Sequence, residues 1–156
     1  MGYHMIDLLI WYFGLPDKVL AETSCDAKEN VMYDAEDTAQ IIFEYDQKKI
    51  WGSMLISRVI PPKQEYFNVY GTRGFVHLER GKIERFSSDG VLQESLSREN
   101  SWPSASQDQL EYFVKVIRGE KDNIGNPEFH FNHLALIEAA YKSLEDKKFI
   151  SPESLL

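Results

Sequence analysis

Cysteine, basic side chains and long apolar runs are all scarce in this sequence of 156 residues. The single cysteine, Cys25, excludes an internal disulfide. Lys and Arg number 17 against 25 Asp and Glu, a formal net charge of -8, so we expect neither a nucleic acid nor an anionic membrane surface as a partner. No apolar run is long enough to span a bilayer, and no secretion signal is recognisable. These absences favour a cytoplasmic protein.

The glycines do not form a nucleotide-binding loop. Gly71 and Gly74 flank two residues between expected strands, whereas a dinucleotide-binding Gly-x-Gly-x-x-Gly loop joins a strand to a helix. A hairpin turn therefore explains this pair of glycines better. No serine lies in a Gly-x-Ser-x-Gly motif, and Cys25 lies in a polar stretch, so no catalytic nucleophile is recognisable. We expect no cofactor-binding residues in this chain.

Hydrophobic periodicity and turn signals predict an α+β fold in a single domain over residues 1–156. The expected elements are an apolar helix over residues 2–13, strands over 18–23, 38–45, 49–60, 66–70, 75–78, 82–86 and 91–96, a polar connection over 97–106, a helix ending before Gly119 and a last helix over 132–145. Short turns join antiparallel neighbours, because parallel strands need long crossovers. We expect a mainly antiparallel, open-faced sheet with helices on one face and a buried N-terminal helix.

Large apolar side chains occur at both odd and even positions along the expected strands. They are Phe43, Tyr45, Trp51, Met54, Ile56, Tyr66, Phe67 and Tyr70. Because side chains alternate between the two faces of a strand, both faces of the sheet need at least partial cover. Helices can cover one face. We expect a second copy of the chain to cover the other, which predicts a homo-oligomer formed through the sheet face.

The opening helix carries a histidine and an aspartate, His4 and Asp7, in apolar surroundings. Residues three apart lie on the same face of a helix, so we expect the two side chains to be close together and buried. Burial beside a carboxylate tunes histidines that transfer protons. The spacing alone leaves two interpretations open: a general acid/base, or a structural pair inside a packed helix.

Metal binding is the weaker hypothesis for the histidines. His4, His77, His130 and His133 would have to converge from three separate elements. His130 and His133 could lie one turn apart on a helix, but no glutamate accompanies them in a metalloprotease-like pattern. We therefore expect no metal.

Trp102, next to Pro103 in the polar connection, is a candidate wall of a ligand site. Loop aromatics also serve in packing, because they bury a large apolar surface. Its position leaves both interpretations open.

The opening residues resemble the start of the C-terminal domain of the family that includes glucose-fructose oxidoreductase, inositol dehydrogenase and MocA-like oxidoreductases (Gfo/Idh/MocA). The matching residues are Gly2, His4, Asp7 and Trp11, followed by Gly14-Leu15-Pro16 and Val19. Later segments are also similar to that domain: Glu36-Asp37-Thr38-Ala39, the run over residues 69–75, and Glu138-Ala139-Ala140-Tyr141-Lys142-Ser143. The resemblance covers essentially the whole chain.

The resemblance implies an NAD(P)-dependent dehydrogenase acting on sugars, nucleotide sugars or cyclitols. Family members place NAD or NADP mainly on an N-terminal Rossmann domain, which we expect to be absent from this chain. His4 matches the family's catalytic histidine, and Asp7 and Trp102 are candidate substrate-binding or supporting residues. The family's catalytic aspartate would precede Met1, so we expect this chain alone to be inactive. The alternative is a non-enzymatic oligomerisation or binding module that uses the open sheet face.

Overall fold

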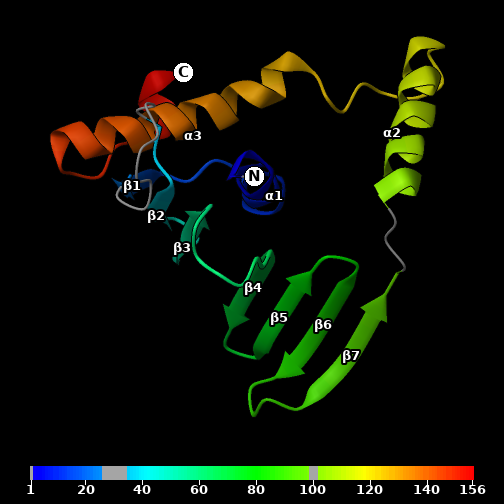
Figure 1. Cartoon of the computed structure of the whole chain (residues 1–156), viewed down its shortest axis with the longest axis horizontal. Helices are drawn as coiled ribbons and strands as arrows, with labels where there is room; N and C mark the ends of the chain where they lie inside the picture. Colours follow the sequence, from blue (N-terminus) through cyan, green and yellow to red (C-terminus); the bar gives the residue numbers. More distant parts are fainter. Residues whose placement is uncertain (1, 26–34, 99–101) are drawn as a thin grey trace. The chain divides into compact units, whose positions relative to one another are not determined.

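The computed structural model describes residues 2–25, 35–98 and 102–156, except for the side chains of residues 102–104. The described chain divides into two compact units (Figure 1). The first comprises residues 1–60 and 124–156, and the second comprises residues 61–123.

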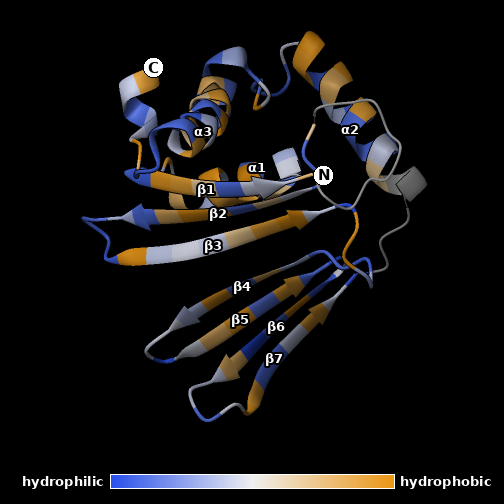
Figure 2. Ribbon diagram, turned by 60° about the vertical axis from the view of Figure 1, so that its left-hand side comes forward, coloured by the Kyte–Doolittle hydropathy of each residue, from blue (hydrophilic) through white to orange (hydrophobic). Residues whose placement is uncertain are grey.

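The first unit contains a three-stranded antiparallel sheet in the order β1-β2-β3. Its elements are α1 (Gly2–Phe13), β1 (Lys18–Ser24), β2 (Thr38–Tyr45), β3 (Ile50–Ser57), α3 (Pro127–Asp146) and the 3-10 helix η1 (Pro152–Leu155). Helix α3 packs against β1, and α1 packs against α3 (Figure 2). Both helices lie on one face of this sheet, as the sequence predicts.

The core of the first unit follows the alternation of its strands. The buried residues Val19, Phe43 and Met54 belong to the face that the helices cover, because Val19 pairs with Phe43 and Ile41 pairs with Met54. On the opposite face, Ile42, Leu55 and Trp51 are exposed, and Trp51 exposes 78% of its surface. One face of the sheet is therefore open, as the sequence predicts.

A buried serine fixes α3 against the sheet. The Ser143 hydroxyl donates to the Ala140 carbonyl at 2.6 Å and accepts the Ala21 backbone N–H at 2.8 Å. It thereby satisfies a strand N–H that would otherwise be buried without a partner. This contact sets the position of α3 relative to β1.

Tyr45 fixes the other helix of the unit. Its hydroxyl donates to the Gly14 carbonyl at 2.8 Å, directly after the end of α1. Gly14 has φ +79°, the left-handed conformation that ends many helices. Burial raises the pKa of the Tyr45 phenol, so it stays a neutral hydrogen-bond donor throughout the physiological range.

The second unit contains a four-stranded antiparallel meander in the order β4-β5-β6-β7, followed by a helix. Its elements are β4 (Tyr66–Gly71), β5 (Gly74–Glu79), β6 (Lys82–Ser87), β7 (Leu92–Ser97) and α2 (Trp102–Ile117). Phe75 and Phe86 stack with ring centroids 4.5 Å apart. The described residues thus form two open antiparallel sheets, which confirms the predicted α+β class.

Two helix boundaries differ from the sequence prediction. Helix α3 begins at Pro127 rather than residue 132, because the Asn126 side chain accepts the Phe129 N–H and Pro127 suits the first helical position. Helix α2 begins at Trp102, inside the stretch expected to be a polar connection. The earlier start of α3 matters most, because it puts His130 on the helix.

The expectation of a buried N-terminal helix holds for one side only. Ile6, Leu9 and Ile10 of α1 are buried, whereas Trp11 and Tyr12 are exposed. Among the described helices, none combines the length and apolarity required to cross a membrane.

Candidate functional site

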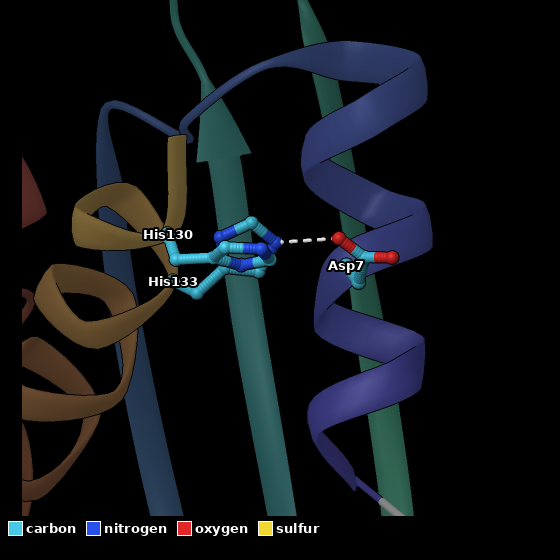
Figure 3. A group of neighbouring side chains, drawn as sticks. All are labelled: Asp7, His130 and His133. Atoms are coloured by element: carbon cyan, nitrogen blue, oxygen red, sulfur yellow. Dashed lines mark hydrogen bonds and ion pairs between the residues drawn. The ribbon is translucent and has the colours of Figure 1, made fainter. Parts of the chain in front are cut away.

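Three polar side chains meet where α1 faces α3 (Figure 3). His133 Nε2 lies 2.8 Å from Asp7 Oδ1, and His130 lies beside them, so that one ligand atom from each residue falls within 4.8 Å of the others. The His133 side chain is completely buried, whereas that of Asp7 exposes 42% of its surface. We call Asp7, His130 and His133 the α1–α3 cluster.

Local sequence positions the two histidines. The Asn126 cap and Pro127 start α3 early enough for His130 and His133 to occupy one helical face, three residues apart. His133 Nδ1 lies 3.2 Å from the Phe129 carbonyl oxygen, one turn earlier in the same helix. Because a carbonyl only accepts hydrogen bonds, His133 bonds to it in the tautomer that carries a proton on Nδ1.

Aromatic side chains enclose the cluster. The Tyr3 hydroxyl lies 2.9 Å from His130 Nδ1, and its ring stacks on His133 with centroids 5.3 Å apart. Phe129 meets His133 edge-on, with centroids 5.1 Å apart. Tyr3 and Asp7 come from α1, so the cluster joins residues that are far apart in the sequence.

His4 does not share these surroundings. The expectation that His4 and Asp7 form a buried pair is wrong, because His4 is exposed and Asp7 bonds instead to His133. His4 is exposed because it lies about 200° around the helix from the buried Ile6, on the side of α1 that faces away from the core. An exposed imidazole can meet a ligand from outside the unit. Trp102 starts α2, but its side chain lies outside the described residues.

Sequence reasoning identified only part of the cluster. It singled out Asp7 but assigned its partner to the same helix, and it noted that His130 and His133 could lie one turn apart. Tyr3 was missed. The Asn126-Pro127 signal would have placed both histidines on one helix, although nothing local reveals that α1 packs against it.

The described residues contain no glycine-rich loop of the kind that binds the phosphates of a dinucleotide cofactor. Gly71 and Gly74 pair with each other across the β4–β5 turn, which is a hairpin as the sequence predicts. An open hollow in the second unit contains none of the predicted site residues; its lining includes Tyr66, Asn68 and His77. The described part of the chain therefore does not supply the strand-loop-helix that holds a pyrophosphate.

The fold is shared with solved oxidoreductases. One is an oxidoreductase from Agrobacterium radiobacter, solved in complex with NAD+, L-tartaric acid and magnesium. The match covers 100% of this chain and 49% of the Agrobacterium chain, with a TM-score of 0.75 and 20% sequence identity. Another is a candidate myo-inositol dehydrogenase from Sinorhizobium meliloti 1021. This match covers 97% of the present chain and 48% of the Sinorhizobium chain, with a TM-score of 0.67 and 21% sequence identity.

A third match is the biliverdin reductase from Synechocystis sp. PCC 6803, solved with biliverdin and NADP+. It covers 91% of this chain and 44% of its own, with a TM-score of 0.72 and 12% identity. The chain thus spans about half the length of the solved proteins that it resembles. At these identities the likeness establishes the fold.

A sequence comparison establishes the family. Residues 1–151, nearly the whole chain, match the family described as "Oxidoreductase family, C-terminal alpha/beta domain". A comparison with curated proteins finds no match. The family match confirms the resemblance drawn from the opening helix and the later segments. The chain belongs to the Gfo/Idh/MocA oxidoreductase family, as its C-terminal alpha/beta domain.

Proposed function

We propose that this chain is the substrate-binding and catalytic-histidine part of an NAD(P)-dependent oxidoreductase. Its substrate would be a hydroxyl or carbonyl group of a sugar, nucleotide sugar or cyclitol. The family match over residues 1–151 carries this proposal. The structural likeness to a candidate myo-inositol dehydrogenase is consistent with a polyhydroxylated substrate.

The proposed chemistry assigns a proton transfer to His4. Oxidation of a secondary alcohol removes a hydride, which a nicotinamide accepts, and a proton, which a base must take. His4 is exposed on α1, so its imidazole is accessible to a substrate hydroxyl. Asp7 follows one turn later, where its half-exposed carboxylate can accept a hydrogen bond from a second hydroxyl while it holds His133.

The cofactor would bind mainly to a partner domain. Relatives of this fold contain about as much chain again, and structures of two of them include NAD+ or NADP+. The described residues here offer no phosphate loop, so the proposal assigns the dinucleotide to a Rossmann domain outside this chain. In that arrangement this chain alone would not catalyse the reaction.

A cofactor-reduction assay tests the proposed function. The complete oxidoreductase containing this chain is incubated with NAD+ or NADP+ and a panel of sugars, nucleotide sugars and cyclitols, and absorbance of the reduced nicotinamide is followed. We expect turnover with at least one panel member and none with this chain alone. Turnover by the chain alone would contradict the proposed division of labour, and complete inactivity towards the panel would overturn the substrate class.

The open sheet face favours a second role, in self-association. Ile42, Leu55 and Trp51 lie exposed on one face of β1–β3, where they form an apolar surface suited to a second copy of the chain. We expect sedimentation to show a dimer or larger oligomer, and W51E to shift it towards monomer. L134E is the control, because Leu134 is also a large apolar residue that is mostly exposed, at 54%, but lies on α3. A monomeric wild type would contradict this role.

A further inference from the structure

We propose that the α1–α3 cluster binds a divalent transition-metal ion of the Zn²⁺ type, with Asp7, His130 and His133 as its protein ligands. This site shares Asp7 with the proposed substrate site but does not include His4, and it does not depend on the proposed oxidoreductase activity. Imidazole and carboxylate are the ligands from which proteins build three-residue zinc sites.

The ligand atoms lie near metal-binding distances, and an ion would require a small rearrangement of them. Two ligands on a tetrahedral zinc ion lie about 3.4 Å apart, given bonds of about 2.1 Å. His133 Nε2 and Asp7 Oδ1 are closer than this, at the hydrogen-bond distance of 2.8 Å, so an ion would move them slightly apart; the ligand atoms of all three residues fall within 4.8 Å of one another. Asp7 and His130 are partly exposed, so their side chains have room to rotate towards one ion.

The contacts of His133 are compatible with a metal ion at its Nε2. In the tautomer with its proton on Nδ1, His133 donates to the Phe129 carbonyl and directs the Nε2 lone pair at the Asp7 carboxylate, 2.8 Å away. A nitrogen lone pair and an ionised carboxylate oxygen repel each other unless a proton or a metal ion lies between them. A metal ion would replace that proton, so binding would release it.

The surrounding residues resemble the outer shell of a metal site. Metal-ligating histidines usually donate their second N–H to a carbonyl, and the Phe129 carbonyl lies 3.2 Å from His133 Nδ1 in the position to accept it. The Tyr3 hydroxyl bonds His130 Nδ1 and holds that ring in place. Because His133 is fully buried and Asp7 is half exposed, an ion would have solvent on one side only.

The ligand set selects the class of metal. Two imidazoles and one carboxylate suit Zn²⁺ and neighbouring transition ions, whereas Mg²⁺ and Ca²⁺ prefer oxygen ligands. Three protein ligands leave at least one coordination position open for water or an added ligand. The ion would also link α1 to α3, the two helices that cover the sheet.

Metal titration of the metal-free protein tests the site directly. Calorimetry with ZnCl2 is expected to give one ion per chain, with proton release detected as a dependence of the heat on buffer ionisation. Zn²⁺ should also raise Tm, because it binds the folded state. Co²⁺ in place of Zn²⁺ should give visible ligand-field bands, which report nitrogen and oxygen coordination.

Substitutions assign the ligands without removing the buried His133. D7N keeps the shape and a hydrogen bond to Nε2 but removes the charge, and H130Q removes a partly exposed ligand. Each is expected to weaken Zn²⁺ binding by more than about 100-fold, beyond the 10- to 100-fold loss typical of an outer-shell partner and expected for Y3F. H77Q is the histidine control in the second unit and should bind as the wild type does.

The outcomes separate a metal site from a hydrogen-bonded tie. Circular dichroism of the metal-free variants checks that each remains folded. If the wild type binds no Zn²⁺ stoichiometrically, the cluster is an ion pair between helices and the proposal fails. If D7N and H130Q bind as tightly as the wild type, the ion sits elsewhere and the assignment is equally overturned.

Discussion

Replacing His4 with glutamine is expected to lower kcat/KM for alcohol oxidation by about 100- to 10,000-fold in the proposed NAD(P)-dependent enzyme, the range typical of a lost general acid/base. Glutamine preserves polarity and approximate size but cannot accept the hydroxyl proton. Most of the loss should lie in kcat, because the interaction strengthens as the proton moves. His4 is exposed, so the change should leave the free energy of unfolding nearly unaltered.

The measurement is a steady-state assay across pH with the H4Q variant and the wild type. The pH dependence of kcat/KM should change shape, because the variant lacks the group that accepts the hydroxyl proton. H77Q serves as the control for a histidine outside the proposed site, in the second unit. Wild-type turnover by H4Q would remove His4 from the mechanism while leaving the family assignment intact.

The fold class could be predicted because its signals are local. The strand over Thr38–Tyr45 was predicted at its observed bounds, since its apolar run ends at a polar turn. Gly14 predicted the end of α1, and its positive φ explains why glycine stands there. The division of the strands into two sheets at the Pro61-Pro62 segment was not predicted. Prolines end a strand without indicating whether the next one joins the same sheet.

The site could be predicted only in part, because its contacts join distant segments. Asp7 and His133 are 126 residues apart, and no periodicity indicates which residue of α3 faces α1. The apolar composition of α1 predicted a helix buried on all sides. His4, three residues before Asp7, was therefore the expected partner of Asp7. Tyr3 escaped notice for the same reason, since its contacts are with His130 and His133. Helix spacing identifies residues that share a face but not what that face meets.

These contacts give the N-terminal half of α3 two roles. Its capping residue, Asn126, starts the helix, and the next turn carries the histidines that contact α1. Its C-terminal half is fixed to β1 through Ser143. The positions of His130 and His133 therefore depend on packing in the middle of α3.

Replacing Leu136 with alanine tests that dependence and is expected to lower the free energy of unfolding by about 2–5 kcal/mol. Leu136 exposes 1% of its surface, so the substitution removes apolar contacts and leaves a cavity beneath α3. The measurement is urea denaturation followed by circular dichroism. L134A is the matched control, because Leu134 lies on the same helix but is 54% exposed, and it should change the free energy by less than about 0.5 kcal/mol. Equal losses for the two variants would show that α3 does not pack against the rest of the first unit through Leu136, and the positions assigned to His130 and His133 would fail with it.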